Sequence, residues 1–538
     1  KMNIHDFNKK FVLNNEVKRI DAYPGLRLSE FLREKENLKG TKVGCNAGDC
    51  GSCTVLVDNN ACCSCLITLA KVENKKVETI EGVKNSELFS KLKDSFSFYG
   101  AAQCGICTPG MLMASVALLR KNKNPNIKEV EEALSGVLCR CTGYRKILLA
   151  VSNVHKKFKK EAVIKARNEV GKRLERLDGK EKIEGTDIFG DDYHPKGSLI
   201  AKVIRSPYNT AKFSFGSIKN WKENNPGVEI ILTANDIPGI NKFGVIPNFD
   251  DQPALAYEKT KFRGEAVAII AGSPDKMKDL KLSDFPIYWE PENETMDITE
   301  ALNKKNPNIH DKKSKDNILI VGTVKTGNVD IVSNNSFEIK GKLETSYVEH
   351  AYIEPEAGSS WLEGDILVIQ ACTQAPYMDR DDTAKILGLE KNKVRIIPSS
   401  AGGGFGSKLD VSLQPLLGLV TLKTKKPCRL TYSRKESMIS TTKRHPAVMK
   451  ASISSDQKGK ILSMKFHGDF NTGAYASWGP TVANRVPIHA SGPYRIPNYQ
   501  AIGRAIYTNG PVSGAFRGFG VPQAAAIQET LLDQLAEK

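Results

Sequence analysis

Eight cysteines within the first 141 residues are the side chains best suited to metal or redox chemistry. They form two groups: Cys45, Cys50, Cys53 and Cys65, then Cys104, Cys107, Cys139 and Cys141. Thiolate suits iron–sulfur clusters and zinc. In a chain with no visible secretory signal, such spacing favours metal binding over disulfides. Taken alone, the second group (C-x-x-C, then C-x-C) leaves both an iron–sulfur cluster and structural zinc open.

The first group has the spacing of plant-type 2Fe–2S proteins, C-x4-C-x2-C with a fourth, more distant cysteine. Its loop, GCNAGDCGSC, is rich in glycine, so backbone N–H groups can turn toward the cluster sulfurs. Zinc ribbons instead use paired C-x-x-C knuckles. We therefore predict a 2Fe–2S site here and, by association, a second one at the other group. Cys62 and Cys63 are interpreted as ordinary small residues, since four ligands are already present.

The segments around these cysteines must position them. A hairpin over 11–17, turning at Asn14-Asn15, and a short helix over 28–36 indicate a small β-rich module. Apolar residues at helical spacing predict helices over 110–121 and 127–138. The second group therefore lies where helices meet.

The rest of the chain has a mixed α/β pattern. Strands are predicted over 198–205, 228–232, 265–271 and 394–397. A polar loop over 303–317 indicates a boundary. The most basic run, 156–182, holds one aromatic residue and several acids, so a solvated linker or docking face is favoured over a nucleic-acid surface.

Composition limits the class of protein further. The 538 residues carry a net charge of +17, from 78 basic and 61 acidic side chains. No run of eighteen apolar residues predicts a membrane span, and the first residues lack the apolar region of a secretory signal. A cytoplasmic protein is expected.

Two glycine-rich turns in the last third could bind a flat or anionic group: SSAGGGFGSK over 399–408 and SGAFRGFG over 513–520. The first lacks the spacing of a Walker or dinucleotide loop, so a strained turn without a ligand stays open. In the second, a buried Arg517 would need a partner, either a ligand or an internal carboxylate.

Together these motifs resemble the xanthine dehydrogenase (molybdenum hydroxylase) family. The resemblance rests on GCNAGDCGSC, AQCGICTPG, LCRCTGY, RSPYNTAK, TQAPYMDRDDTAKILGL, AGGGFGSK, KRHPAVMK, YRIPN and AFRGFGVPQ, in family order. It implies a multidomain α+β chain. Its parts would be a β-grasp, ferredoxin-like 2Fe–2S domain (1–82), a helical-bundle 2Fe–2S domain (83–155), a charged linker (156–185), an α/β hammerhead-like domain (186–305) and the N-terminal part of a molybdopterin-binding domain (320–538).

The resemblance also implies roles at the cofactor. The two cysteine groups would each hold a 2Fe–2S cluster. Gln103 and Cys141 match positions that contact the pterin, and Gln374 matches a glutamine that hydrogen-bonds a molybdenum oxygen. The backbone at Phe405, between Gly404 and Gly406, would meet the same centre, and Arg517 matches another cofactor contact. Molybdenum-molybdopterin, with a dinucleotide form of it left open, is the expected cofactor.

Substrate residues follow from the same resemblance. Phe519 matches an aromatic residue that stacks on substrate. Arg485 could stabilise charge on a heterocycle or pair with a carboxylate such as that of nicotinate. Leu409 replaces a glutamate of xanthine-specific relatives. We therefore predict an N-heteroaromatic substrate, purine-like or pyridine carboxylate, over an aldehyde. Glu356 and His350 are interpreted as structural.

The FAD domain of many relatives and the segment with their catalytic glutamate have no counterpart in these residues. We expect a second molybdenum-binding subunit that supplies this glutamate and a further subunit that carries FAD; the competing explanation is a fragment of a longer polypeptide. The other functional class left open is an electron-transfer subunit without a molybdenum site. Neither nucleic acid nor a membrane is an expected partner.

Overall fold

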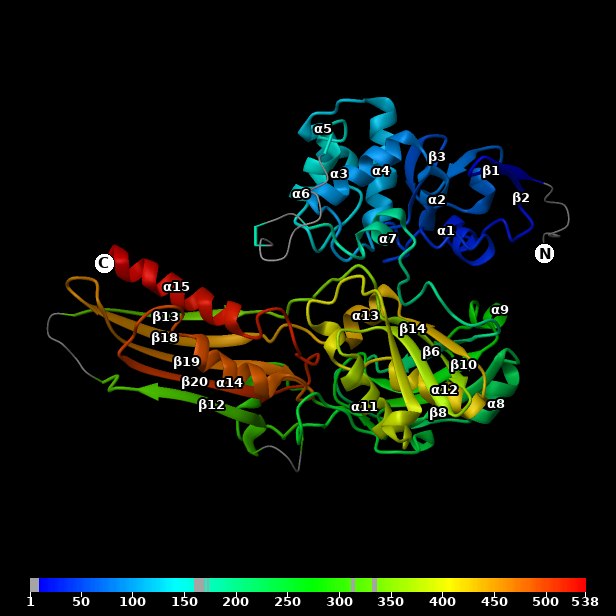
Figure 1. The fold of residues 1–538 in the computed structure, drawn as a ribbon. Helices are drawn as coiled ribbons and strands as arrows, with labels where there is room; N and C mark the ends of the chain where they lie inside the picture. Colours follow the sequence, from blue (N-terminus) through cyan, green and yellow to red (C-terminus); the bar gives the residue numbers. More distant parts are fainter. Residues whose placement is uncertain (1–8, 159–169, 172–173, 311–314, 331–335) are drawn as a thin grey trace.

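A computed structural model describes residues 9–158, 170–171, 174–310, 315–330 and 336–538. Figure 1 shows two small N-terminal modules, blue and cyan, lying along a larger body that contains two separate sheets. The predicted N-terminal region, charged linker and polar loop fall partly outside the described residues, at 1–8, 159–169, 172–173 and 311–314.

The first module is a five-stranded sheet in the order β2-β1-β5-β3-β4. Its strands are β1 (Lys10–Leu13), β2 (Glu16–Arg19), β3 (Thr54–Val57), β4 (Asn60–Cys63) and β5 (Lys76–Glu78). The predicted hairpin is confirmed: Asn14 and Asn15 both have positive φ, 50° and 71°, as a two-residue hairpin turn requires. The predicted helix is confirmed as α1 (Leu28–Glu30) and a following π-helical turn (Phe31–Lys35), which pack on the sheet.

The second module is helical. It consists of α2 (Ile80–Val83), α3 (Glu87–Tyr99), α4 (Thr108–Lys121), α5 (Ile127–Leu134) and α6 (Arg145–Ser152). α5 starts with a capping box between Asn126 and Glu129. It ends four residues before the predicted 138, because the following residues turn and Leu138 N–H bonds the Cys50 carbonyl at 2.9 Å.

The end of the predicted charged linker is folded. α7 (Gly179–Glu184) buries Lys182 and Ile183 and packs against α3 and α4. The described residues that follow 173 are therefore not simply a solvated spacer.

The larger body begins with a seven-stranded sheet in the order β16-β15-β14-β17-β6-β10-β8. These strands are β6 (Leu199–Arg205), β8 (Val228–Thr233), β10 (Ala266–Gly272), β14 (Ala357–Glu363), β15 (Ile366–Cys372), β16 (Val394–Ser399) and β17 (Cys428–Thr431). The four predicted strands are confirmed within two residues at each end. Because β17 pairs with β6 at Cys428 and Leu199, the sheet joins the segments 186–305 and 320–538 that the sequence separates.

Helices and a smaller sheet surround this sheet. The helices are α8 (Ile218–Asn224), α9 (Pro274–Met277), α11 (Pro376–Leu387), α12 (Gln414–Thr424) and α13 (Arg434–Ser440). α12 packs on β14, β15 and β17, and α11 packs on α12 and β16. The small sheet has the order β11-β7-β9 and consists of β7 (Ala211–Phe215), β9 (Lys259–Thr260) and β11 (Ile287–Pro291).

The last part is a five-stranded sheet in the order β12-β20-β19-β18-β13. Its strands are β12 (Ile318–Thr326), β13 (Ser336–Thr345), β18 (Ala447–Asp456), β19 (Ile461–Gly473) and β20 (Asn498–Tyr507), and its helices are α10 (Ile298–Ala301), α14 (Gly479–His489) and α15 (Val521–Glu537). α14 packs on β12, β19 and β20, and α15 on β13 and β18 (Figure 1). No helix in the described residues is long and apolar enough to span a membrane.

The two glycine-rich turns leave different sheets. The 399–408 turn follows β16 of the seven-stranded sheet, whereas the 513–520 turn follows β20 of the five-stranded sheet. The fold therefore brings them together only where the two sheets meet.

Candidate active site

The first cysteine group lies in the loop before β3 and in the turn after β4. The Cys45 thiol contacts that of Cys50, and the Cys53 thiol contacts that of Cys65. Backbone N–H groups of Ala47 and Cys50 donate to Cys45 Sγ, both at 3.4 Å. The glycine-rich loop thus turns its N–H groups inward, as an anionic cluster would require.

Cys63 lies closer to this group than the sequence indicated. Its thiol contacts Cys53 and raises the pKa of Cys53 to about 11. Cys65 contacts the same Cys53 thiol. Two neighbouring cysteines of one turn are thus candidates for the fourth ligand, and the choice of Cys65 stays a prediction.

The second group lies at the start of α4 and after α5. Cys104 contacts Cys141, and Cys107 contacts Cys139. The contact with Cys107, and a 3.1 Å contact with Thr142 Oγ1, lower the pKa of Cys139 to about 5 despite burial. The partner thiols shift the other way, since the same contacts and burial raise the pKa values of Cys107 and Cys104. Each pair thus has one thiol that loses its proton more readily, and the thiolate is the form that binds metal.

The arrangement of both groups fits a two-iron cluster. In each group the thiols form two contacting pairs, and a 2Fe–2S cluster takes four cysteines, two on each iron. In the described residues no set of three or more His, Cys, Asp or Glu side chains surrounds the position of a single metal ion. One cluster would be held by Cys45, Cys50, Cys53 and Cys65, and the other by Cys104, Cys107, Cys139 and Cys141.

The two groups are in contact with each other. A Cβ on Gly51 would lie 2.0 Å from the Gly136 carbonyl, so the backbones meet directly. Cys50 packs with Ile106 and Ile353 in one apolar cluster, and Cys45 and Cys104 lie against it. The two cysteine groups are thus joined by a small apolar cluster, and this short distance suits electron transfer between them.

The first glycine-rich turn surrounds the side chain of Gln374. Gly406 N–H donates to Gln374 Oε1 at 3.0 Å, and Gln374 N–H donates to the Lys408 carbonyl at 2.8 Å. A Cβ on Gly404 would lie 2.4 Å from Gln374 Oε1, so a larger residue there would push the Gln374 side chain aside. Phe405 has a positive φ of 55°, which orients its peptide groups unlike those of an extended strand.

The second turn packs on the first. Arg517 N–H donates to the Phe405 carbonyl at 2.9 Å, and a Cβ on Gly406 would lie 2.4 Å from the Ala515 carbonyl. The expectation of a buried Arg517 is wrong: its side chain is exposed, and the contact that joins the turns is made by its backbone N–H. No internal carboxylate is then needed to balance its charge.

Two of the three predicted substrate residues, Arg485 and Phe519, lie together. Arg485 Cζ lies 5.6 Å from the Phe519 ring centroid, and Trp478 meets the same ring edge-on at 5.4 Å. Leu409 is half-buried, and its N–H donates to the Gly406 carbonyl at 3.1 Å. One aromatic residue with a cation beside it thus lies two residues after Arg517.

The cysteine modules touch this region at two points. A Cβ on Gly402 would lie 3.0 Å from Ile106, the residue between Gly105 and Cys107. Arg140 Nε donates to the His350 carbonyl at 2.9 Å, and the His350 ring contacts the Ala515 carbonyl at 2.8 Å. Burial lowers the pKa of His350 to about 3, so the ring is neutral. His350 is structural in this sense, as predicted.

Gln103 is exposed on the cysteine side, and its carbonyl accepts a hydrogen bond from Arg176. Sequence reasoning missed this arginine. It also missed Glu354, which accepts from the Gly190 and Gly402 N–H groups and from Lys408 Nζ. The lysine of AGGGFGSK was a visible signal for a buried charge, but its partner lies 54 positions earlier.

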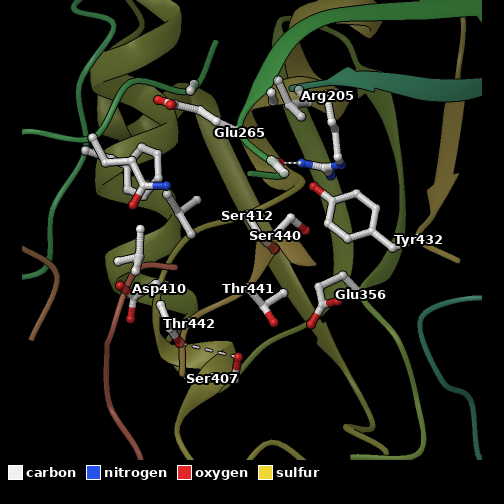
Figure 2. A pocket seen from close by; sticks show the side chains of 18 of the residues that line it. Arg205, Glu265, Glu356, Ser407, Asp410, Ser412, Tyr432, Ser440, Thr441 and Thr442 are labelled. Carbon is white, nitrogen blue, oxygen red and sulfur yellow. Dashed lines mark hydrogen bonds between the residues drawn. The ribbon is translucent and has the colours of Figure 1, made fainter. Parts of the chain in front are cut away.

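A cavity of about 60 Å³ lies behind the first turn, between it and β6 and β10 (Figure 2). Arg205 Nε and Nη2 and Glu356 Oε2 have no hydrogen-bond partner among the described residues, although Arg205 Nε lies 3.5 Å from Glu436. The volume suits a few water molecules. Ser407 lines it, whereas Gln374 and Phe405 do not, so it is separate from the predicted cofactor site.

Comparison with known protein families matches three parts of the chain. A "2Fe-2S iron-sulfur cluster binding domain" covers residues 11–79, a "[2Fe-2S] binding domain" covers 79–152 and a "Molybdopterin cofactor-binding domain" covers 309–538. Two iron–sulfur domains are thus followed by a molybdopterin-binding domain, as the resemblance implied.

Individual relatives agree with this assignment. The nicotinate dehydrogenase large molybdopterin subunit of Eubacterium barkeri is 36% identical over 370 residues, which are 68% of this chain and 86% of that subunit. The xanthine dehydrogenase iron-sulfur-binding subunit of Escherichia coli O157:H7 is 43% identical over 146 residues, 27% of this chain and 91% of that subunit.

A solved structure matches the whole fold. The aldehyde oxidoreductase of Desulfovibrio desulfuricans ATCC 27774 superposes with a TM-score of 0.91 at 27% identity over 98% of this chain. The chain spans only 61% of that enzyme. On the cysteine pairs, the two joined turns and these matches, the chain belongs to the xanthine dehydrogenase family of molybdenum hydroxylases.

Proposed function

We propose that this chain is the iron–sulfur and molybdenum-cofactor-binding subunit of a hydroxylase that uses water to oxidise an N-heteroaromatic substrate. Electrons would leave one at a time through the two 2Fe–2S clusters. One observation carries the proposal: the turn around Gln374 packs at Gly402 on Ile106, between cysteines of the second group. The predicted redox centre and the predicted electron path are therefore neighbours.

The residues around the turns would bind and orient the cofactor. When bound, the cofactor supplies two-electron redox chemistry and the activation of water. Gln374 has its Oε1 occupied by the Gly406 N–H, so its Nε2 is left as a donor on the exposed side. Gln103 and Cys141 would contact the pterin from the cluster side, and Arg517 would do so from the second turn.

Arg485 and Phe519 would select the substrate. An aromatic ring in a stacked or edge-on arrangement favours a flat heterocycle, and a guanidinium favours a carboxylate or a developing negative charge. Leu409 offers no hydrogen bond to a purine. The pairing of Arg485 with Phe519 thus supports a pyridine carboxylate or purine, and the 36% identity to the nicotinate dehydrogenase subunit agrees.

An aldehyde substrate is the second candidate. The observation in its favour is the superposition of almost the whole chain on an aldehyde oxidoreductase. A subunit that only transfers electrons is a third candidate, and the contact between Gln374 and the first turn argues against it.

The partners would be a second molybdenum-binding subunit with the catalytic glutamate and a subunit with FAD. Gln374, Arg485 and Arg517 are all exposed in the described structure, so a covering partner would have to exclude water from them. The relative named as a large molybdopterin subunit supports such a division. The dinucleotide form of the cofactor and a cytoplasmic location stay predictions.

Metal analysis and a substrate panel test the proposal. The native complex, purified through this chain, should contain molybdenum and iron in a ratio of one to four, since two clusters hold four irons. It should reduce an electron acceptor with nicotinate or a purine faster than with an aldehyde. Iron without molybdenum would favour the electron-transfer reading, and preference for aldehydes would favour the second candidate.

A further inference from the structure

The described end of the linker, residues 174–187, forms a strap on the second cysteine group. A Cβ on Gly105, which adjoins Cys104, would lie 2.7 Å from the Lys182 side chain, so the stem of Lys182 covers that loop. At the far end of the strap, Ser400 Oγ donates to Asp187 Oδ1 at 2.7 Å. The strap therefore joins the cluster loop to the start of the first glycine-rich turn.

Arg176 is the residue of the strap that reaches the backbone before Cys104. Its Nη1 donates to the Gln103 carbonyl and, at 3.4 Å, to the Ala102 carbonyl. Its Nη2 donates to Asp178 Oδ2 at 3.0 Å. Because Gln103 directly precedes Cys104, the guanidinium lies beside the backbone that carries a predicted cluster ligand.

Two cations of the strap are paired with acidic side chains of the same strap. Lys182 Nζ lies 2.6 Å from Asp187 and 3.4 Å from Asp178, and Arg176 pairs with Asp178. Reduction of a cluster adds one negative charge, so a nearby cation stabilises the reduced form and a nearby anion destabilises it. Removal of either partner of the Arg176–Asp178 pair would therefore change the potential, in opposite directions.

We propose that Arg176 sets the reduction potential of the cluster held by the second cysteine group, and positions the Ala102–Gln103 backbone beside it. The linker would then take part in electron transfer through Arg176, a positioning residue that acts on the cluster and not on the substrate. The inference rests on the proposed function only in that these cysteines hold a 2Fe–2S cluster.

The test is an EPR-monitored redox titration of the native complex at low ionic strength. Arg176→Gln should make the midpoint potential of one of the two clusters more negative, and Asp178→Asn should make the same potential more positive. Arg176→Lys should restore most of the wild-type value, because it keeps the charge. Since the side chain of Arg176 is 46% exposed, the difference should shrink as salt is added.

Lys180→Gln is the matched control. This exposed lysine lies four residues after Arg176 in the same strap, at the start of α7. No described contact joins it to residues 101–104, so its removal should leave both potentials nearly unchanged. Three results would overturn the inference: unchanged potentials in Arg176→Gln, shifts of the same sign in Arg176→Gln and Asp178→Asn, or a shift confined to the Cys45 cluster. The titration measures only the potentials of the iron–sulfur clusters. A complex with two clusters but no molybdenum would therefore contradict the proposed function, while the potentials of the Arg176 and Asp178 variants could still be compared.

Discussion

Lys408 Nζ lies 2.8 Å from Glu354 Oε2, and the two side chains are only 1% and 4% exposed. The same carboxylate accepts from Gly190 N–H at 2.9 Å and from Gly402 N–H at 2.5 Å. One buried ion pair thus holds the first glycine-rich turn against the segment that arrives from the cluster modules.

Lys408→Met should strongly destabilise the molybdopterin-binding part, because it leaves the Glu354 carboxylate buried and unpaired. A loss of about 3–5 kcal/mol is expected for such a change, measured as a lower unfolding transition in calorimetry. Adding Glu354→Gln should recover part of the loss, since the unpaired charge is then gone. Lys391→Met, at a lysine 64% exposed and paired with Asp381, should change stability by no more than about 0.5 kcal/mol.

Gly51→Ala should separate the two cluster modules. Its Cβ would lie 2.0 Å from the Gly136 carbonyl, and φ is +67°. Gly143→Ala is the control: φ is similar at +63°, but nothing lies within 4 Å of the added Cβ. Both variants carry the strain of a left-handed alanine, and only the first carries the clash. Iron content and visible absorption should fall in Gly51→Ala alone; equal losses would show that strain, not contact, decides.

The sequence was most informative where local patterns decide the structure. The Asn14-Asn15 hairpin, the helix from Thr108 and four strands of the seven-stranded sheet follow from turn chemistry and periodicity. The cysteine spacing indicated the group of four thiols that the fold brings together, but not that Cys104 pairs with Cys141 and Cys107 with Cys139. These features depend on neighbours a few residues apart.

Contacts over long sequence distances were not predictable in the same way. Nothing near Leu199 indicates that its strand pairs with Cys428, and nothing near Arg517 indicates that its side chain is exposed. Glu354 and Arg176 carry no motif, because their partners lie in other modules. The roles of Gln374, Phe405 and Arg485 came from resemblance. The structure adds the contact of Gln374 with the turn that contains Phe405 and the position of Arg485 beside Phe519.

The fourth ligand of the first cluster can be tested within one turn. Cys65→Ser should remove that cluster, whereas Cys63→Ser should retain it, because the C-x4-C-x2-C pattern with Cys65 as the distant ligand is the predicted set. EPR of the reduced protein distinguishes the two clusters, and iron content should halve only in Cys65→Ser. The reverse result would assign the ligand to Cys63, which also contacts Cys53.

Glu265 should make stability depend on pH. Burial raises its pKa from 4.5 to about 7, although Tyr475 and the Lys261 N–H donate to it. Between these values the folded protein keeps a proton that the unfolded chain has lost, so stability falls as the pH rises from about 4.5 to 7. The loss is on the order of 3 kcal/mol.

Glu265→Gln should remove this component, while His350 and His445, whose pKa values burial lowers to about 3, act alike in both proteins. The difference in unfolding temperature between wild type and variant, followed from pH 5 to 8, is the measurement. If that difference does not vary with pH, the folded-state pKa of Glu265 is not raised.

Arg485→Ala should lower kcat/KM for the N-heteroaromatic substrate by about a hundredfold or more, the usual effect of losing one group that stabilises developing charge. The cation is exposed and 5.6 Å from the Phe519 ring, so its removal should leave the fold and both clusters intact. Arg495→Ala, at an exposed arginine ten positions later, is the control for a general loss of charge. An aldehyde has neither a ring nitrogen nor a carboxylate for Arg485 to meet, so any aldehyde activity should change little. Equal losses on both substrate classes would assign Arg485 to the cofactor, and full activity on the heterocycle would remove it from the site.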